Sequence, residues 1–305
     1  MPAAPALSPR IMLAPDGPEF SRIVLGLWRL GEWQLTPSQR LALVEQALTL
    51  GVSTIDQADI YGGYTSEALF GEALALAPGL RQQLQIVSKC GIRLVHPNRP
   101  GNRIKHYDTG GAYLIASVEQ SLKNLRTDYL DLLLIHRPDP LMEADEVAEA
   151  FGRLQRDGKV RYFGSSNFTP AQFELLASRH PLVTNQVELS VLHVQALDDG
   201  SLDQAQRLRC APMIWSALAG GRLFIESDAQ GERVRAVLAQ IAATYAVSPA
   251  VIAIAWVLRH PSRPLVLTGS GRLAAIAEAV AATQLVLTRA EWFAILAASS
   301  GREVA

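Results

Sequence analysis

The chain has 305 residues, of which 49% are hydrophobic and 19% are charged, and its formal net charge is −1. A chain of this length can bury roughly three quarters of its unfolded surface, so it needs neither metals nor disulfides to build a core. The charge balance leaves no basic excess for phosphate backbones, and we therefore expect no nucleic-acid partner. The two cysteines, Cys90 and Cys210, have no C-x-x-C spacing, which is typical of a reducing compartment.

The N-terminal segment MPAAPALSPR has no charged stretch followed by an apolar one, so it does not resemble a signal peptide. We expect residues 1–9 to form a short flexible tail. No segment reaches the ~18 uninterrupted apolar residues that a membrane helix needs. These features predict a cytoplasmic protein without a membrane partner.

Short apolar runs alternate with stretches of helical period through most of the chain. Helix starts are indicated by Thr36-Pro37, Thr169-Pro170 and Ser248-Pro249, because each pair offers an N-cap and a proline at the first helical position. The predicted strands are residues 23–27, 53–56, 85–89, 129–136, 160–165, 184–189, 212–217 and 264–269. Strands that alternate with helices imply parallel pairing through right-handed crossovers.

Eight such units favour a closed (β/α)₈ TIM barrel over an open α/β sheet. The first strand leads into the segment 26–31, GLWRLG, which lacks the G-x-G-x-x-G phosphate loop of an open dinucleotide-binding sheet. Before it, residues 10–13 and 19–23 flank a Pro-Asp-Gly turn, which predicts a β-hairpin that closes the bottom of the barrel. No linker interrupts the repeat, so we expect one domain over residues 1–305.

Ionisable residues gather where three successive predicted strands end. Asp56 ends the second strand and Tyr61 follows five residues later, while Lys89 and His136 end the third and fourth strands. Adjacent strands of a barrel lie about 4.8 Å apart, so these side chains can converge on one pocket. Two long loops, residues 90–111 and 219–231, are expected at the same C-terminal face, where barrel enzymes keep their sites.

Each of these residues also has an ordinary structural interpretation. Lys89 could be a solvated strand end, His136 a satisfied core histidine, Tyr61 a packing aromatic and Asp56 a cap. Four independent accidents at three successive strand ends explain the pattern poorly. A common site explains it better.

The four residue types suit the reduction of a carbonyl group. Such a reaction needs hydride at carbon and a proton at oxygen, and a phenol such as Tyr61 can donate the proton. Its ordinary pKa is near 10, and an ammonium such as Lys89 is expected to lower that pKa. Asp56 would keep the ammonium charged, and His136 could hydrogen-bond the carbonyl oxygen.

Several segments in this order resemble the motifs of the aldo-keto reductase superfamily, and in particular its bacterial oxidoreductase branch. The resemblance covers about residues 20–290. The matching segments are residues 56–67 (DQADIYGGYTSE), 88–89 (SK), 134–136 (LIH), 161–168 (RYFGSSNF) and 185–188 (NQVE). The resemblance implies a (β/α)₈ barrel that reduces aldehydes or ketones with NADPH. It also implies Asp56, Tyr61, Lys89 and His136 as the catalytic residues.

The same resemblance assigns residues to the cofactor. Ser166, Asn167 and Gln186 would hold the nicotinamide carboxamide, and Trp215 would stack on the nicotinamide ring, although a core tryptophan is the alternative. The remaining implied contacts are Ser216, Leu218, Gly220 and Arg222 for the pyrophosphate, and Gly26, Leu27 and Trp28 for the floor of the pocket.

The adenosine end departs from the family pattern. Gly269, Ser270, Gly271 and Arg272 resemble the segment that receives the 2′-phosphate, and a glycine-rich turn before a helix suits a phosphate. Many members place further polar residues along this helix, where this chain has Ala275 and Ala279. Ser270 and Arg272 are therefore the candidates for reading the phosphate, and NADH is expected to bind more weakly than NADPH.

Three alternatives remain beside this interpretation. Lys89 could be the nucleophile of a Schiff-base aldolase, or the protein could be a cofactor-binding regulatory relative without catalysis. A metal-dependent hydrolase is disfavoured because the six histidines form no His-x-His or H-x-x-x-H pair. We expect no metal, a small-molecule carbonyl substrate and a monomer.

Overall fold

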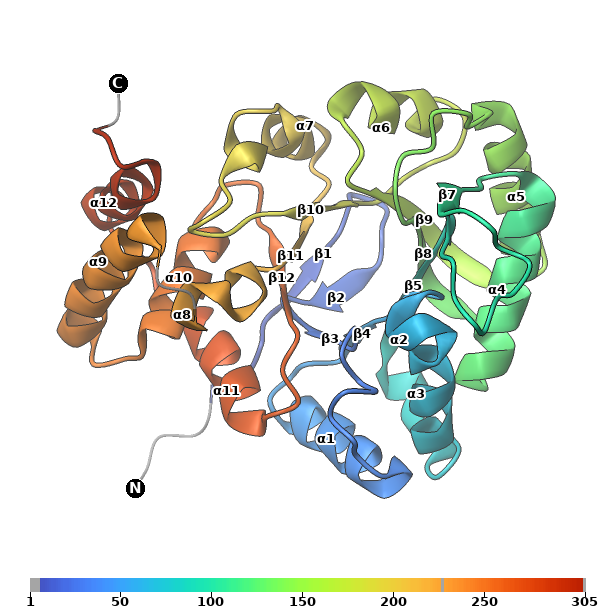
Figure 1. Cartoon of the computed structure of the whole chain (residues 1–305), viewed down its shortest axis with the longest axis horizontal. Coiled ribbons are helices and arrows are strands. Elements are labelled where there is room, and N and C mark those ends of the chain that lie inside the picture. The colour runs from blue at the N-terminus through green and yellow to red at the C-terminus, as the bar shows by residue number, and fades with distance from the viewer. Residues whose placement is uncertain (1–5, 226–227, 304–305) are drawn as a thin grey trace.

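The computed structural model describes residues 6–225 and 228–303. Within them, eight parallel strands close into a barrel in the order β10-β11-β12-β3-β4-β5-β8-β9, with helices around the outside (Figure 1). The barrel strands are β3 (Ile23–Gly26), β4 (Thr54–Asp56), β5 (Gln85–Cys90), β8 (Leu130–Ile135), β9 (Val160–Ser166), β10 (Asn185–Glu188), β11 (Met213–Trp215) and β12 (Leu265–Thr268). All eight lie within a residue or two of the predicted strands, and the (β/α)₈ barrel is confirmed.

The strands are apolar runs without alternation because both of their faces are covered. Every residue of β8 is buried, as is every residue of β3 and β4. Val24, Val87 and Leu132 belong to a cluster that fills the barrel interior, whereas a larger cluster lies between the barrel and its helices. This double burial is typical of parallel strands in α/β proteins.

A β-hairpin closes the bottom of the barrel, as predicted. Strands β1 (Arg10–Met12) and β2 (Glu19–Ser21) pair antiparallel, and Phe20 packs into the interior cluster. The Ser21 hydroxyl accepts hydrogen bonds from the backbone N–H groups of Ser53 and Thr54 at the start of β4, at 3.2 and 3.0 Å. Figure 1 shows the hairpin at the centre of the ring.

The segment before the hairpin is only partly the tail that we expected. Ser8 is buried, its backbone N–H donates to the Leu50 carbonyl at 2.8 Å, and its hydroxyl accepts from the Ile23 N–H at 3.1 Å. A residue with these bonds is anchored to the first barrel strand. Residues 1–5 lie outside the described part of the chain.

The helices begin where the sequence offers caps. Thr36 and Thr169 form capping boxes with the glutamines three residues on, and the Ser248 side chain caps the helix that follows it. The α-helices are α1 (Pro37–Thr49), α2 (Tyr61–Tyr64), α3 (Ser66–Leu74), α4 (Gly111–Leu125), α5 (Ala144–Arg156), α6 (Pro170–Ala177), α7 (Ser201–Leu208), α8 (Arg222–Ile225), α9 (Ala229–Tyr245), α10 (Pro249–Leu258), α11 (Leu273–Ala282) and α12 (Arg289–Ser300). Short 3₁₀ helices are η1 (Pro78–Gln83), η2 (Gln195–Leu197) and η3 (Ala219–Gly221).

Two long loops follow the carboxyl ends of β5 and β11. The first contains a small antiparallel hairpin, β6 (Ile92–Arg93) and β7 (His106–Tyr107), and the second contains η3 and α8. In the described ranges, no single helix combines the length and the apolar character that a membrane crossing needs. Helices α9 and α10 reach those limits only as a pair, across a bend of 95°.

Candidate active site

Three of the four predicted catalytic side chains form one hydrogen-bonded cluster, in which Asp56 and Lys89 are buried and Tyr61 is half-buried. The Lys89 Nζ lies 2.6 Å from Asp56 Oδ1 and 3.0 Å from the Tyr61 hydroxyl oxygen. It also donates to the Gln57 carbonyl at 2.8 Å. Lys89 is only 1% exposed. Its three donors are therefore used in directions that fix the ammonium next to the phenol.

Strand register places these groups together. Asp56 ends β4, whose partner β5 carries Lys89 two residues beyond the last paired position, Val87. The Asp59 N–H then donates to the Lys89 carbonyl at 3.0 Å, which continues the pairing past the end of β4. Two residues further on, the Tyr61 hydroxyl reaches the Lys89 side chain of β5.

Tyr61 sits on an unusual left-handed turn. Gly62, Gly63 and Tyr64 have φ values of 58°, 63° and 71°, a region that is costly for a bulky residue such as Tyr64. The Tyr64 hydroxyl accepts from the Leu94 N–H at 2.7 Å. A Cβ on Gly63 would lie 2.4 Å from a ring nitrogen of His96. The loop after β5 therefore packs directly on the turn that carries Tyr61 and holds it in place.

His136 completes the group from the end of β8. Its ring lies edge-on to that of Tyr61, with 5.8 Å between ring centroids. The His136 Nδ1 atom is buried and has no hydrogen-bond partner among the described residues. Burial, followed by the charges of Lys89 and Arg137, holds the pKa of His136 well below its ordinary value. The imidazole is therefore neutral at physiological pH, with one N–H to donate.

The charges at the cluster correct one expectation. Burial raises the pKa of Tyr61, and although Lys89 lowers it, the net pKa lies above the ordinary value rather than below it. For Lys89, burial lowers the pKa, but Asp56 and Tyr61 outweigh burial and the net pKa is raised. At neutral pH the pair is therefore an ammonium beside a protonated phenol. Sequence reasoning expected the ammonium to outweigh the desolvation of the phenol, and the structure shows the opposite balance.

Two further acids lie beside the cluster, the buried Glu67 and the half-buried Asp59, and neither was assigned a role from the sequence. Glu67 accepts a hydrogen bond from the Ser88 hydroxyl at 2.6 Å and one from Asn124 at 3.3 Å. Burial raises the pKa of Glu67, and burial followed by the charge of Glu67 raises that of Asp59 well above its ordinary value. Asp59 Oδ1 has no partner among the described residues. Both acids occur in the DQADIYGGYTSE segment, together with Asp56 and Tyr61. Their position in this segment was the sequence signal that could have placed them near the site.

The residues assigned to the nicotinamide lie together at the ends of β9, β10 and β11. Asn167 donates to the Ser166 hydroxyl at 2.7 Å and accepts from the Trp215 indole N–H at 3.1 Å. Gln186 donates to Asp56 Oδ2 at 2.8 Å, which links this group to the predicted catalytic cluster. Sequence reasoning did not foresee that link.

Several backbone positions in this region have positive φ. Asn167 has a φ of 59° and Ser216 one of 53°, both directly after a barrel strand. Strained backbone of this kind gathers at ligand sites, where it turns polar groups toward the opening. The next segment, around η3, is held to the segment after β3 by Arg29, which donates to the Gly220 carbonyl at 3.1 Å.

The other predicted cofactor residues are distributed along the same side of the mouth. Gly26 and Leu27 are buried at the end of β3, whereas Trp28 is 57% exposed and carries Arg29 over its ring at 5.3 Å. Arg222 lies 3.8 Å from Asp228 at the start of α9. Ser216 and Leu218, which precede Arg222 in the segment after β11, have half-buried side chains.

The predicted 2′-phosphate segment forms the turn between β12 and α11. Arg272 is the N-cap residue of α11 and is exposed, and its N–H donates to the Ser270 hydroxyl at 3.2 Å. Gly271 faces Trp33, because a Cβ there would lie 2.7 Å from the indole ring. Ala279 is completely buried on α11.

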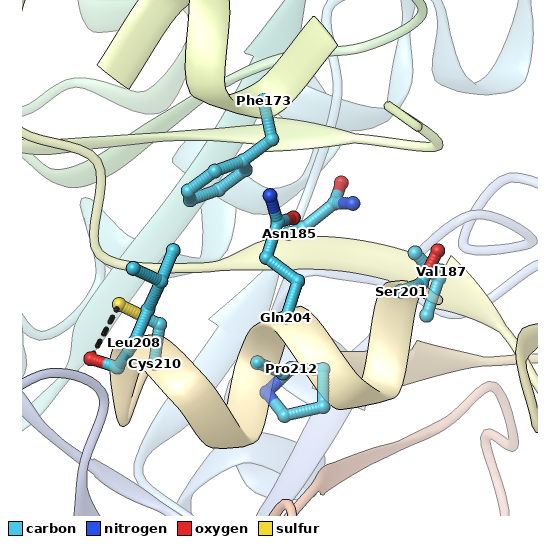
Figure 2. Close-up of a pocket in the computed structure, with 9 residues that line it drawn as sticks. Phe173, Asn185, Val187, Ser201, Gln204, Leu208, Cys210 and Pro212 are labelled. Carbon is cyan, nitrogen blue, oxygen red and sulfur yellow. Dashed lines mark hydrogen bonds between the residues drawn. The ribbon is translucent and has the colours of Figure 1, made fainter. Parts of the chain in front are cut away.

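A separate small cavity lies between α6, β10 and α7. Figure 2 shows Phe173, Asn185 and Gln204 at its wall. Its volume of about 10 Å³ holds one water molecule at most. Asn185 uses its side chain to bond Ser165 and Phe168, so this cavity belongs to the packing under the site.

Comparison with known proteins identifies the family. The model of the Aldo/keto reductase family matches residues 22–299. The chain belongs to this family. It is 55% identical to the oxidoreductase YdhF of Escherichia coli, over 97% of this chain and 99% of that one. It is 44% identical to a 6-dehydroglucose reductase of Agrobacterium fabrum, with the same shares covered.

The solved structures agree with this assignment. The glycerol dehydrogenase AKR11B4 from Gluconobacter oxydans superposes with a TM-score of 0.82 at 25% identity, and the match covers 98% of each chain. The protein is thus an aldo-keto reductase, an oxidoreductase of a family that uses NAD(P)H. Within the described residues, no group of three or more His, Cys, Asp or Glu side chains could hold a metal ion.

Proposed function

We propose that this aldo-keto reductase uses NADPH to reduce an aldehyde or ketone to an alcohol, with Tyr61 as the proton donor. The observation that supports this most directly is the position of the Tyr61 hydroxyl, 3.0 Å from a Lys89 ammonium that Asp56 holds at 2.6 Å. A half-buried phenol beside a fixed positive charge is suited to giving up a proton and stabilising the anion that remains.

The residues at the ends of β9, β10 and β11 fit a nicotinamide ring. Ser166 and Gln186 are buried polar side chains, and Asn167 reaches the same opening from a left-handed backbone position. We assign these three to the carboxamide and Trp215 to the ring face. When bound, the dihydronicotinamide supplies hydride to the carbonyl carbon.

Proton transfer is then a task for the protein. Tyr61 is protonated at neutral pH because burial keeps its pKa above the ordinary value. As the carbonyl oxygen gains negative charge, Tyr61 passes its proton to that oxygen. The phenolate left behind is stabilised by Lys89, and Asp56 keeps Lys89 charged through an ion pair that water does not reach. The neutral imidazole of His136 donates its N–H to the same oxygen and orients it toward Tyr61.

We assign the 2′-phosphate of NADPH to Arg272, with Ser270 beside it. Arginine can hold a phosphate through paired, charge-assisted hydrogen bonds. Because the helix behind it carries Ala275 and Ala279, Arg272 is the one cation between Gly269 and Ala279. A single cation supports a preference for NADPH on the order of 10–100-fold, with NADH as a weaker alternative.

Two other functions are less well supported. A Schiff-base lysine has to be a neutral amine when it attacks, whereas the pKa of Lys89 is raised. A regulatory relative that only binds the cofactor would not need the bonded group Asp56, Lys89 and Tyr61. A monomer in the cytoplasm stays a prediction from the sequence.

The test is cofactor oxidation, followed by the loss of absorbance of the reduced nicotinamide, with a panel of aldehydes, ketones and quinones. Both NADPH and NADH are used. Because one relative is named a 6-dehydroglucose reductase, small polar aldehydes belong in the panel. We expect turnover with aldehydes and faster turnover with NADPH. Tight NADPH binding without turnover of any carbonyl would instead favour the regulatory function.

A further inference from the structure

Arg137 is a charged residue at the mouth of the barrel that the proposed reaction does not use. It follows His136 directly, and its guanidinium carbon lies 5.6 Å from the centre of the Trp215 ring. In the barrel, β9 and β10 lie between β8, which precedes Arg137, and β11, which carries Trp215. The side chain therefore extends across the mouth, above the ends of two strands.

The Arg137 guanidinium has no carboxylate partner in the described part of the chain. No ion pair joins Arg137 to any Asp or Glu among the residues that the structure describes, whereas Arg81 is paired with Asp131 and Arg93 with Asp108. Arg137 is only partly exposed, and an arginine stays charged at every physiological pH. A partly buried positive charge without a counter-ion suits a ligand that brings the negative charge.

The loop after β5 adds positive charge to the same side of the mouth. Residues 91–110 contain four arginine or lysine residues and a single acidic one. Arg93 is neutralised by Asp108 at 2.9 Å, but Arg99, Arg103 and Lys105 are exposed. The Arg99 guanidinium carbon lies 4.5 Å from the centre of the Tyr64 ring. Tyr64 follows Tyr61 by three residues, so this charge is near the proposed proton donor in the chain. The whole chain has a net charge of −1, so this is a local excess.

The cations of the loop after β5 lie on the side of the mouth opposite the residues assigned to the cofactor phosphates. The residues assigned to the pyrophosphate and the 2′-phosphate follow β11 and β12. In the order of the closed barrel, β12, β3 and β4 lie between β11 and β5 on one side, and β10, β9 and β8 lie between them on the other. The loop after β5 is therefore opposite β11, and its charge faces the part of the mouth left for the substrate.

We propose that the preferred substrates are carbonyl compounds that carry a carboxylate, and that Arg137 binds this carboxylate while the loop cations attract it. The proposal rests on the proposed function, since it concerns the carbonyl that Tyr61 protonates. Arg137 is a specificity-determining residue in this scheme. An arginine presents a planar pair of donors to the two carboxylate oxygens.

The experiment compares each acid with its own methyl ester, which removes only the charge. Suitable pairs are succinic semialdehyde and terephthalaldehydic acid with their methyl esters, at two distances between carbonyl and carboxylate. We expect wild-type kcat/KM to be at least about tenfold higher for the acid of one pair, which corresponds to one charge-assisted contact. Raising the salt concentration should lower that ratio, because exposed loop charges are screened.

Arg137→Gln should reduce the acid-to-ester ratio of kcat/KM about tenfold, mainly by raising the KM for the acid. Arg137→Lys should keep part of that ratio. Arg289→Gln is the matched control. It removes an exposed arginine from the start of α12, and the ratio should not change. The ratio separates recognition from a structural effect, because a disturbed Trp215 would slow both members of a pair equally.

Equal kcat/KM for acids and esters in the wild type would overturn the proposal and leave the proposed function intact. An equal loss for both in Arg137→Gln would also overturn it, and would make Arg137 a support for Trp215. Absence of turnover with every acid and ester, and with the aldehyde panel as well, would instead remove the proposed function and the substrate proposal together.

Discussion

The two ends of the proposed site are built in different ways. At the catalytic end, Lys89 is buried and makes three hydrogen bonds within the chain. At the adenosine end, Arg272 is exposed, and its side chain makes no ion pair or hydrogen bond with any of the described residues. The first arrangement is organised before any ligand arrives, and the second depends on the ligand for its partner. Changes at the first end should therefore affect the chemical step, and changes at the second should affect binding.

The largest effect is expected for Tyr61→Phe. The ring remains to pack against His136, but no hydroxyl is left to donate the proton. We expect kcat to fall at least about 10²-fold, the usual contribution of a positioned acid, while the Kd for NADPH stays nearly constant. The measurements are steady-state kinetics and cofactor titration. If the variant kept more than about a tenth of wild-type kcat, Tyr61 would not be the proton donor.

Lys89→Met tests the electrostatic half of the catalytic end. Loss of the ammonium removes the main charge that lowers the pKa of Tyr61, while burial and Asp56 still raise it. In alcohol oxidation the phenolate is the base, so activity rises as Tyr61 ionises. We expect this rise to move to higher pH and kcat to fall about as much as in Tyr61→Phe. The kcat–pH profile for oxidation is the measurement.

The same substitution should also affect folding. It leaves Asp56 buried without its ammonium, which costs roughly 3–5 kcal/mol in other proteins. Thermal unfolding measures this loss, and the double variant Asp56→Asn/Lys89→Met should recover part of it by removing the unpaired carboxylate. An unshifted pH profile in a folded Lys89→Met protein would mean that Lys89 does not tune Tyr61.

The same contrast explains what could be predicted from the sequence. Periodicity located all eight barrel strands, because strands buried on both faces are continuous apolar runs. The ends of those strands then located Asp56, Lys89 and His136, because the barrel brings consecutive strand ends together. Even the closing hairpin was accessible from its Pro-Asp-Gly turn.

What the sequence could not supply depends on distances between side chains. The net direction of the Tyr61 pKa shift required a comparison of burial with one ammonium, and burial is a property of the fold. The bond from Gln186 to Asp56 joins residues 130 positions apart. Arg137 was an unremarked neighbour of His136 until its side chain was seen to reach Trp215. Ser8 was expected to belong to a flexible tail, whereas its bonds to Leu50 and Ile23 anchor it.

The smallest effect is expected at the adenosine end, for Arg272→Ala. Its side chain is exposed at the first turn of α11, so its removal should not disturb the barrel. NADPH should lose an arginine–phosphate contact, whereas NADH has no 2′-phosphate to lose. We expect the Kd for NADPH to rise on the order of 10–100-fold, with little change for NADH, so that most of the preference disappears.

Titration of tryptophan fluorescence with both cofactors measures the two Kd values, with Trp215 as the reporter nearest the proposed nicotinamide site. Since the catalytic end is untouched, kcat at saturating NADPH should stay close to that of the wild type. Ser270 lies on the same turn as Arg272. Ser270→Ala should raise the Kd for NADPH by a smaller factor, because a hydroxyl contributes one neutral donor to the phosphate. If Arg272→Ala weakened the binding of NADH and NADPH equally, Arg272 would lie near the pyrophosphate instead, and the 2′-phosphate would bind elsewhere.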